Sequence, residues 1–311
     1  MGRGERYSLD GKAVLVTGAA RGIGAESARR LAARGARVAV VGLEPELLQR
    51  VAADCGDEGA WFEADVTDEE GLRAAVDGTV ERFGGIDVCV ANAGVGAGGM
   101  VRLMEPRALA RVIEINMVGT VNTLRLCLPH VIERRGYMLP VSSRAAIAAG
   151  PGTAAYAASK AGIETFANSL RMEVAHLGVD VGVAYFSWVD TDLARGSEEH
   201  VEFRKLRESL KGPMGRTYPV SEAAGAIVRG IETRARWAMS PGWIRWMLYL
   251  RGVLPFVVER QLLPLMPEVD RIAEAEAARV GPERLSAPVG AGGEAALRAE
   301  RERLSTAAAA R

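Results

Sequence analysis

A tyrosine and a lysine that could move a proton together stand four positions apart in the segment YAASK, at residues 156–160. The spacing of apolar residues predicts a helix over 153–177, and positions i and i+4 share one helix face. A free phenol titrates near pH ~10, and a nearby positive charge favours its anionic form. Tyr156 is therefore a candidate general acid or base. The same spacing also occurs on solvated helices, so the rest of the chain must decide.

A glycine-rich segment near the start of the chain, TGAARGIG at residues 17–24, could cradle a phosphate. It lies directly between a predicted strand and a predicted helix. Gly18 permits a tight turn, Gly22 lets the backbone approach a pyrophosphate, and Gly24 lets the helix pack closely on the strand. A glycine loop can also be only a flexible turn, but its position here predicts a dinucleotide site.

Strands and helices that could position these residues alternate up to residue 192. Because β-branched and apolar residues dominate these short runs, they read as strands buried on both faces. We therefore predict an α/β fold with a doubly wound parallel sheet, a Rossmann fold, in a single domain. Pro140 lies within one predicted strand, where we expect a local irregularity. The predicted strands are 13–17, 37–41, 61–64, 86–91, 137–142 and 180–185, and the predicted helices are 23–34, 46–54, 69–83, 107–134 and 153–177.

The order of these motifs resembles the short-chain dehydrogenase/reductase family in its compact form. The pattern TGxxxGxG comes first, Asp65-Val66 and Asn92-Ala93-Gly94 follow predicted strands, and YxxxK comes later. The resemblance covers residues 9–193 and, more loosely, 221–239. It implies an oxidoreductase that transfers a hydride between NAD(P)(H) and an alcohol or ketone.

The family resemblance also implies a catalytic set made of Asn116, Ser143, Tyr156 and Lys160. Ser143 precedes Tyr156 by thirteen positions, the usual separation for the serine that binds the substrate oxygen, although Ser142 is adjacent and could be confused with it. Lys160 would also hold the nicotinamide ribose, and Asn116 would hold a water in a proton relay. No metal is required, because the cofactor carries the hydride.

The cofactor site implied by the same resemblance extends along the carboxyl edge of the sheet. Asp65 and Val66 would contact adenine, and Thr191 would meet the nicotinamide carboxamide. Phe186 and Ser187 replace the Pro-Gly pair common in the family, and this puts the shape of that loop in doubt. The whole predicted set is Gly18, Arg21, Gly22, Ile23, Gly24, Glu44, Asp65, Val66, Asn92, Ala93, Gly94, Tyr156, Lys160 and Thr191.

The choice between the two nicotinamide cofactors depends on the end of the second predicted strand. The acid typical of NAD enzymes would stand at Gly42, and the arginine typical of NADP enzymes would stand near Leu43, and both are missing. Arg21 is a basic residue of the kind that NADP enzymes often carry in this loop. Glu44 could swing inward to a ribose, or could cap the helix that begins at Pro45. The sequence slightly favours NADP(H) over NAD(H).

Composition argues against several other classes of protein. Lys plus Arg and Asp plus Glu both number 39, so no basic excess indicates a nucleic-acid partner. The three cysteines, which are far apart in the sequence, indicate neither a disulfide framework nor a metal site. Residues 1–9 lack the apolar core of a signal peptide, and no run of about 20 uncharged apolar residues occurs. We expect a cytoplasmic protein.

The C-terminal third of the chain is harder to interpret. We expect residues 1–240 to form the catalytic domain, with a substrate loop at 193–219 and a helix at 221–233, and residues 241–311 to form an extension. The Trp-rich stretch 237–258 could be an oligomer interface or core packing, a flap over an apolar substrate, or an interfacial membrane helix. From residue 274 we expect a mobile helix or partial disorder, with a break at 290–293.

Function remains a choice between an enzyme and two other classes. We predict an oxidoreductase acting on an apolar alcohol or ketone, in a homodimer or homotetramer formed by helices 107–134 and 153–177. The alternative is a regulatory or membrane-peripheral protein of the same fold with little turnover. The complete set of Asn116, Ser143, Tyr156 and Lys160 favours the enzyme.

Overall fold

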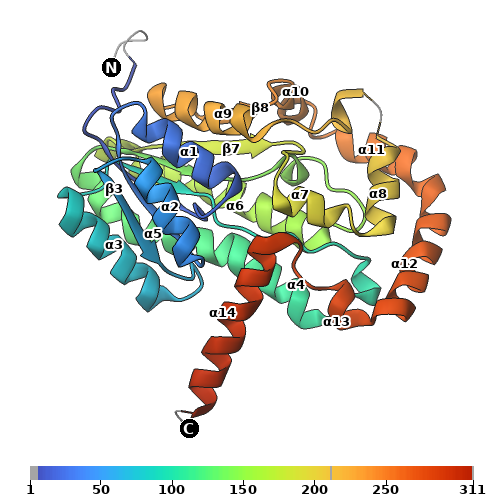
Figure 1. The fold of residues 1–311 in the computed structure, drawn as a ribbon. Helices are drawn as coiled ribbons and strands as arrows, with labels where there is room; N and C mark the ends of the chain where they lie inside the picture. The colour runs from blue at the N-terminus through green and yellow to red at the C-terminus, as the bar shows by residue number, and fades with distance from the viewer. Residues whose placement is uncertain (1–5, 211, 310–311) are drawn as a thin grey trace.

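A computed structural model describes residues 6–210 and 212–309 and contains a six-stranded parallel sheet. Figure 1 shows the fold. The strand order is β3-β2-β1-β4-β5-β6: β2 and β3 are added outward on one side of β1, and the last three strands on the other side, as in a doubly wound fold. The predicted fold class is confirmed. The strands are β1 Ala13–Thr17, β2 Arg37–Gly42, β3 Gly59–Glu63, β4 Val88–Ala91, β5 Tyr137–Pro140 and β6 Asp180–Val181.

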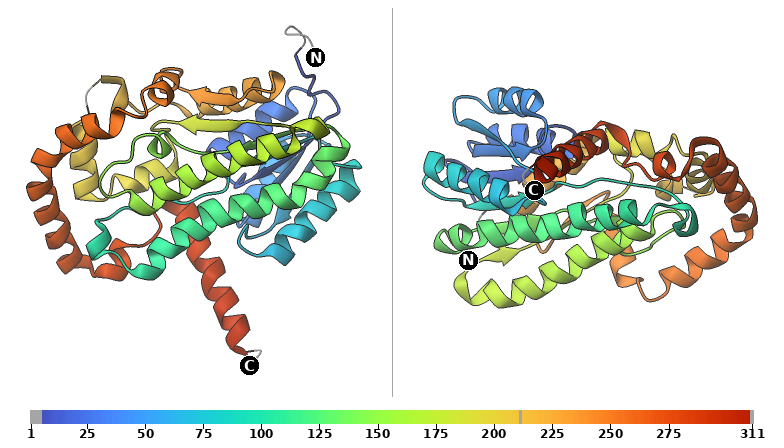
Figure 2. Two further views of the ribbon diagram at one scale, coloured as in Figure 1. Left: turned by 180° about the vertical axis from the view of Figure 1, so that it is seen from behind. Right: turned by 90° about the horizontal axis from the view of Figure 1, so that it is seen from below.

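Helices cover both faces of the sheet (Figure 2). On one face α1 (Gly22–Ala32), α2 (Pro45–Asp54) and α9 (Val220–Glu232) pack on side chains such as Val14 and Val38. On the other face lie α3 (Glu69–Phe83), α5 (Gly119–Glu133) and α6 (Ala154–Val174), which pack around Leu15 and Met138. All residues of β1 and β4 are buried, because neither face of a strand between two helical layers meets water.

The predicted strand 180–185 is divided at Gly182. A Cβ atom at Gly182 would lie 2.0 Å from the hydroxyl oxygen of Tyr137, which donates a hydrogen bond to the carbonyl of Ala235. Beyond this point β7 (Val183–Phe186) pairs with β8 (Trp237–Ser240), and the Val141–Ala184 bridge connects this pair to the end of β5.

Pro140 is the last residue of β5, where an irregularity was expected. Met138 accepts a bond from Gly182 N, and Ser142 N donates to Ala184 O. Since N–H groups alternate in direction along a strand, the N–H that Pro140 lacks would point toward the division between β6 and β7. The missing donor and the divided strand therefore coincide.

The predicted helix 107–134 contains a local widening. It consists of α4 (Pro106–Ile113), one π turn (Glu114–Val118) and α5. A π turn inserts an extra residue into a helix and is frequent at functional sites. Asn116 lies in this turn and is completely buried.

The C-terminal third is more regular than expected. The loop 193–219 contains α7 (Asp192–Ser197) and α8 (Val201–Glu208), and the stretch 237–258 is divided among β8, α10 (Ile244–Tyr249) and α11 (Leu254–Leu262). The tail continues as α12 (Met266–Val280), α13 (Pro282–Leu285) and α14 (Gly290–Ala309). The expected break at 290–293 was wrong: Gly290 begins α14, and the interruption lies before it. No helix of the described residues is long and apolar enough to cross a membrane.

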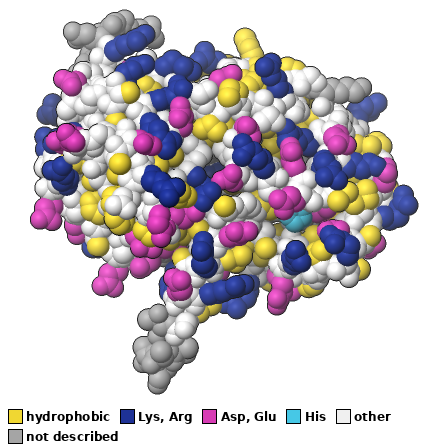
Figure 3. Space-filling model, in the orientation of Figure 1, with side chains coloured by type: hydrophobic (Ala, Val, Ile, Leu, Met, Phe, Trp, Pro, Cys, Tyr) yellow, Lys and Arg dark blue, Asp and Glu magenta, His cyan; other side chains and the backbone are white. Residues whose placement is uncertain are grey.

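Several apolar side chains of α10 and α11 remain exposed. Trp246 and Phe256 are 67% and 70% exposed, so core packing does not account for them, whereas Val258 and Leu262 of α11 line the central cleft. On the face drawn in Figure 3, side chains of both charges are interspersed. The stretch 237–258 thus contributes partly to the cleft and partly to the surface.

Candidate active site

The predicted site residues gather along one continuous cleft at the carboxyl edge of the sheet. Its walls come from the glycine loop after β1, from the segments that follow β2 to β5 and β7, and from α6. Ligands bind at this edge in doubly wound folds. Of the predicted residues, Gly18, Arg21, Gly22, Ile23, Glu44, Asp65, Val66, Asn92, Ala93, Gly94, Ser143, Tyr156, Lys160 and Thr191 all line the cleft.

The glycine loop packs so closely against neighbouring backbone that side chains at Gly18 and Gly24 would not fit. Gly18 has a φ of +64°, and a Cβ there would lie 2.6 Å from the Cα of Ala93. A Cβ at Gly24 would lie 2.4 Å from the carbonyl oxygen of Gly18. These contacts are backbone contacts that cannot give way, so the loop leaves its upper surface free for a phosphate at the start of α1.

Asn92 supports the glycine loop from below. Its side-chain amide donates to the carbonyls of Thr17 (3.0 Å) and Gly18 (3.1 Å), while its backbone N–H donates to the Thr17 hydroxyl. Ala93 N also donates to this hydroxyl at 3.2 Å. Both donors of the Asn92 amide are occupied by the loop, so the residue fixes β1 against β4 and positions the loop.

Tyr156 and Ser143 meet at the centre of the cleft. Burial raises the pKa of Tyr156, and the Ser143 hydroxyl and the positive charge of Arg144 oppose that rise. Ser142 is directed elsewhere: its hydroxyl donates to the Lys160 carbonyl at 2.8 Å. The geometry therefore separates the two adjacent serines, and Ser143 is the one beside the phenol.

Lys160 lies on the same side of α6 as Tyr156. Its ammonium is 5.8 Å from the centre of the Tyr156 ring and donates to the Val141 carbonyl at 3.0 Å. Burial lowers the pKa of Lys160 to about 8. The Tyr156 phenol therefore has the Ser143 hydroxyl and the Lys160 ammonium as neighbours on the floor of the cleft.

Asn116 connects the π turn to the floor of the cleft. Its amide group donates to the Val95 carbonyl (3.0 Å) and the Ser159 hydroxyl (3.1 Å), and its oxygen accepts from Val95 N at 2.8 Å. A Cβ at Gly94 would lie 3.0 Å from this oxygen and 3.3 Å from the Lys160 nitrogen. A single methyl group at Gly94 would therefore contact both Asn116 and Lys160, so these two side chains lie close together.

Ser187 and Thr191, which follow β7, lie where the nicotinamide end of a cofactor would be placed. Thr191 caps α7 by accepting from Ala194 N, and its methyl group faces Gly22 across the cleft. Ser187 lines the same end of the cleft, and its buried hydroxyl has no hydrogen-bond partner among the described residues. Because a buried, unpaired hydroxyl is costly, it fits a place where a ligand amide would supply the partner.

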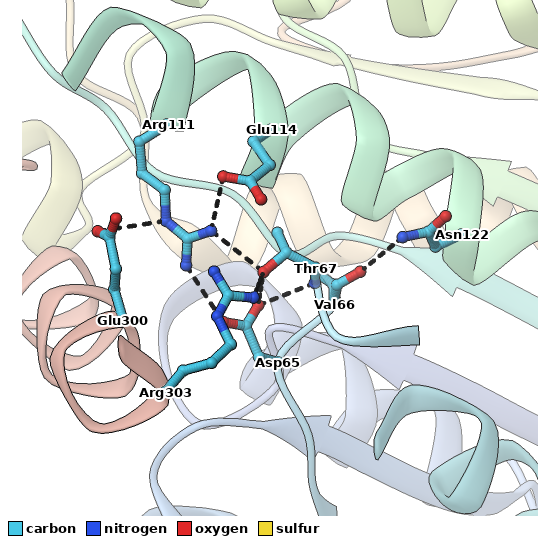
Figure 4. Close-up of polar contacts among 8 residues, drawn as sticks. All are labelled: Asp65, Val66, Thr67, Arg111, Glu114, Asn122, Glu300 and Arg303. Carbon is cyan, nitrogen blue, oxygen red and sulfur yellow. Dashed lines mark hydrogen bonds and ion pairs between the residues drawn. The ribbon is translucent and has the colours of Figure 1, made fainter. Parts of the chain in front are cut away.

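At the other end of the cleft, the predicted cofactor residue Asp65 belongs to a cluster with four residues that the sequence did not single out (Figure 4). Asp65 accepts from Thr67 N at 2.8 Å and pairs with the buried Arg111 of α4 at 3.2 Å. From α14, Glu300 lies 3.7 Å from Arg111, and Arg303 donates to the Thr67 hydroxyl at 3.1 Å. We call these five side chains the α14 clasp.

The start of α14 closes the middle of the cleft. Val289 N donates to the Gly96 carbonyl at 2.8 Å, and Gly292, Gly293, Ala295 and Ala296 line the cleft wall. Figure 1 shows α14 beginning beside α7 near the centre of the molecule and running outward, so that its C-terminal part projects from the body. The C-terminal helix is therefore a wall of the site, which no local signal in the sequence indicated.

Arg21 spans the cleft between two acids. Its guanidinium donates to Glu44 at 2.9 Å, with a second contact to the other carboxylate oxygen, and to Asp192 at 2.8 Å. Glu44 begins α2 but makes no capping bond with its side chain. Its carboxylate is instead occupied by Arg21, so the arginine faces two negative charges.

Comparison with known proteins agrees with this geometry. The fold and cleft define a dinucleotide-binding protein of the doubly wound class. The sequence model of the short chain dehydrogenase family matches residues 12–202, and the chain belongs to that family. It is an oxidoreductase that acts on CH–OH or keto groups and uses NAD(P).

Similar proteins have several different substrates in their names. The chain is 32% identical to 11-beta-hydroxysteroid dehydrogenase 1A of Arabidopsis thaliana, over 81% of this chain and 74% of that protein. It is 33% identical to cis-4-hydroxycyclohexanecarboxylate dehydrogenase of Sinomonas cyclohexanicum, over 70% and 87%. A 3-ketoacyl-(acyl-carrier-protein) reductase structure from Brucella melitensis, complexed with NADH, matches with a TM-score of 0.68 and 29% identity, over 75% of this chain and 98% of that one.

Proposed function

We propose that the protein oxidises an apolar alcohol, or reduces the matching ketone, with Tyr156 as the general acid and base. The observation that carries this proposal is the meeting of the Ser143 hydroxyl and the Tyr156 phenol on the buried floor of the cleft, next to Lys160. The bound nicotinamide supplies or accepts the hydride. The protein's residues orient the substrate and transfer the proton.

In the direction of ketone reduction, Ser143 donates a hydrogen bond to the substrate oxygen and holds the carbonyl. Tyr156 gives its hydroxyl proton to that oxygen as the hydride reaches the carbon. In alcohol oxidation the same phenol, as its anion, takes the proton away.

The substrate end of the cleft supports an apolar substrate. It is lined by Phe203, Leu206, Leu210, Met214, Val258 and Leu262, and by the ring of Trp188. Two relatives are named for alcohols on alicyclic skeletons, the hydroxysteroids and 4-hydroxycyclohexanecarboxylate, which supports the same class. The extension 241–311 contributes α11 and α14 to these walls.

We infer that the cofactor is NAD(H), although the sequence slightly favoured NADP(H). Arg21 is the basic residue on which that preference rested, and Glu44 and Asp192 already compensate its charge. A 2′-phosphate placed beside Arg21 would meet two carboxylates, and like charges repel. Ribose hydroxyls, by contrast, can donate hydrogen bonds to Glu44.

Titration of nicotinamide fluorescence tests the cofactor choice. We expect the parent protein to bind NADH at least about tenfold more tightly than NADPH, a difference of about 1.4 kcal/mol. Glu44→Gln should strengthen NADPH binding, because it releases the Arg21 charge, and should weaken NADH binding. Glu46→Gln, two positions away in α2, is the matched control. Tighter binding of NADPH by the parent would overturn the inference.

A second prediction concerns the charge of Lys160 in the cofactor-free protein. The folded-state pKa of about 8 lies below the unfolded value near ~10.4, so the unfolded chain binds the extra proton between these two values. Stability of the parent should therefore increase as pH rises through this window. Relative to Lys160→Met, the gain should approach about 3 kcal/mol, at about 1.4 kcal/mol per pKa unit.

Urea unfolding of both proteins at pH 7, 8, 9 and 10 measures this difference, since other titrating groups cancel. A difference that does not change with pH would show that Lys160 titrates normally in the folded state. Lys160→Met should also lose turnover, because the ammonium lies beside the phenol.

One further feature of the family pattern, assembly into an oligomer, remains a proposal. Assembly through the outer faces of α4, α5 and α6 would cover Ile113, Val118 and Met172, which are 38%, 45% and 76% exposed. Because such apolar side chains are commonly covered in oligomers, their position supports a homodimer or homotetramer built on these helices.

A further inference from the structure

The cleft contains one positively charged side chain that the reaction does not require. Arg144 follows Ser143 in a short 3-10 turn and lines the substrate end of the cleft. Its guanidinium lies 4.8 Å from the centre of the Trp188 ring. Among the residues that the structure describes, it has neither a hydrogen-bond acceptor nor a carboxylate partner.

The surroundings of Arg144 make its charge costly. Burial and the positive charge of Arg207 together lower its pKa to about 10, and only the Tyr156 phenol acts in the opposite direction. Arg144 is half-buried, and a partly desolvated cation without a counter-ion is destabilising. Such a group is retained where a bound anion supplies the missing charge.

A second arginine beside it, Arg207, differs from Arg144 because its charge is paired within the protein. The guanidinium of Arg207 lies 4.9 Å from the centre of the Trp188 ring, but it is paired with Glu198 and donates to Thr217. Its charge is compensated within the protein. Two arginines thus contact one indole ring, and only Arg144 has its hydrogen-bond donors free to face a ligand.

We propose that Arg144 binds a carboxylate carried by the substrate, so that the protein acts on an apolar hydroxy acid or keto acid. A guanidinium offers two parallel N–H donors that match a carboxylate. The rest of the pocket is apolar, with Phe203, Leu206 and Leu262 facing the substrate end. The substrate therefore combines an apolar ring or chain with one anionic group.

The position of Arg144 also fixes how that substrate lies. Arg144 directly follows Ser143 in the chain. The residue that binds the carboxylate and the residue that binds the reacting oxygen are therefore neighbours in sequence. The apolar part of the molecule then extends toward α8 and α11. In the oxidation of such a hydroxy acid, the alcohol carbon loses its hydride to the oxidised nicotinamide and the hydroxyl proton goes to Tyr156, leaving a keto acid.

Matched substrates and variants test this inference, which rests on the proposed function. The substrates are 4-oxocyclohexanecarboxylate and its neutral methyl ester, each reduced with NADH by the full-length protein, the Arg144→Met and Arg144→Lys variants, and the exposed control Arg245→Met. We expect Arg144→Met to raise KM for the acid by about 50-fold and to leave KM for the ester unchanged. Arg144→Lys should restore part of the affinity for the acid.

A binding measurement keeps the test independent of turnover. Cyclohexanecarboxylate should raise the Tm of the parent with NADH present, cyclohexanol should raise it less, and Arg144→Met should remove the difference while binding NADH as the parent does. Equal binding of cyclohexanecarboxylate by parent and Arg144→Met, or a lower KM of the parent for the ester, would overturn the inference. Absence of turnover on every ketone, with the carboxylate still binding through Arg144, would instead contradict the proposed function.

Discussion

Replacing Tyr156 with phenylalanine should lower kcat/KM by about 10²–10⁴-fold, the range typical of a lost general acid or base. The ring keeps its place on α6, so packing should be unchanged, and only the hydroxyl beside Ser143 is removed. Steady-state rates measured by nicotinamide absorbance, in both directions, give the loss. Because the substrate and the cofactor still bind, the effect should fall on kcat.

Two controls make this result specific. NADH should bind Tyr156→Phe with the affinity of the parent, which separates proton transfer from cofactor binding. Tyr249→Phe removes a hydroxyl from a tyrosine that is 64% exposed, outside the cleft, and should leave the rates unchanged. If Tyr156→Phe retains a tenth or more of kcat, another group transfers the proton, and the regulatory alternative gains support.

Adding one methyl group at Gly18 should have the second largest effect. Alanine in a left-handed conformation costs about 1–2 kcal/mol, and forcing a methyl into a packed site adds about 1–3 kcal/mol. At Gly18 the new Cβ would be 2.6 Å from the backbone of Ala93, so the loop must move away from β4. We expect Gly18→Ala to weaken NADH binding by at least about tenfold and to lower the free energy of unfolding.

Gly11 provides a matched control for that substitution. Its φ of +66° is nearly the same, but a Cβ there would meet nothing within 4 Å. Gly11→Ala should therefore show only the cost of the left-handed conformation, with NADH binding unchanged. Urea unfolding and fluorescence titration of both variants measure the two effects. Equal behaviour of the two variants would mean that the close approach of Gly18 to Ala93 is not what shapes the phosphate loop.

Much of the fold could be predicted because the local pattern and the tertiary environment agree. The first strand is apolar throughout, and the layers of helices on both sides of β1 require that pattern. Asp68 caps α3 and Gly84 ends it in a left-handed conformation, so residues next to the two ends of this helix determine both of its boundaries. The pairing of the proposed catalytic residues Tyr156 and Lys160 could be predicted for the same reason, since it needs only one helix face.

The parts that were missed depend on contacts between distant segments. The glycines at 290–293 suggested a break. Position 290 instead requires glycine for packing, because a Cβ there would lie 2.5 Å from the carbonyl oxygen of Asp192, at the start of α7. The composition reflects tertiary packing there, not a loss of structure. Likewise, the partners of Arg21 and the unpaired charge of Arg144 follow from side-chain positions, which no spacing along the chain reveals.

The α14 clasp has a consequence for how the protein is made. Arg303 and the Thr67 hydroxyl that it contacts are separated by 236 positions in the sequence. The ribosome completes the whole sheet, the glycine loop and the catalytic helix before it reaches the residues that wall the cleft at Asp65 and Arg111. A nascent chain thus has all the residues proposed for catalysis while one side of the cleft is still open, and the enclosed cleft is formed only once α14 has been synthesised and docked.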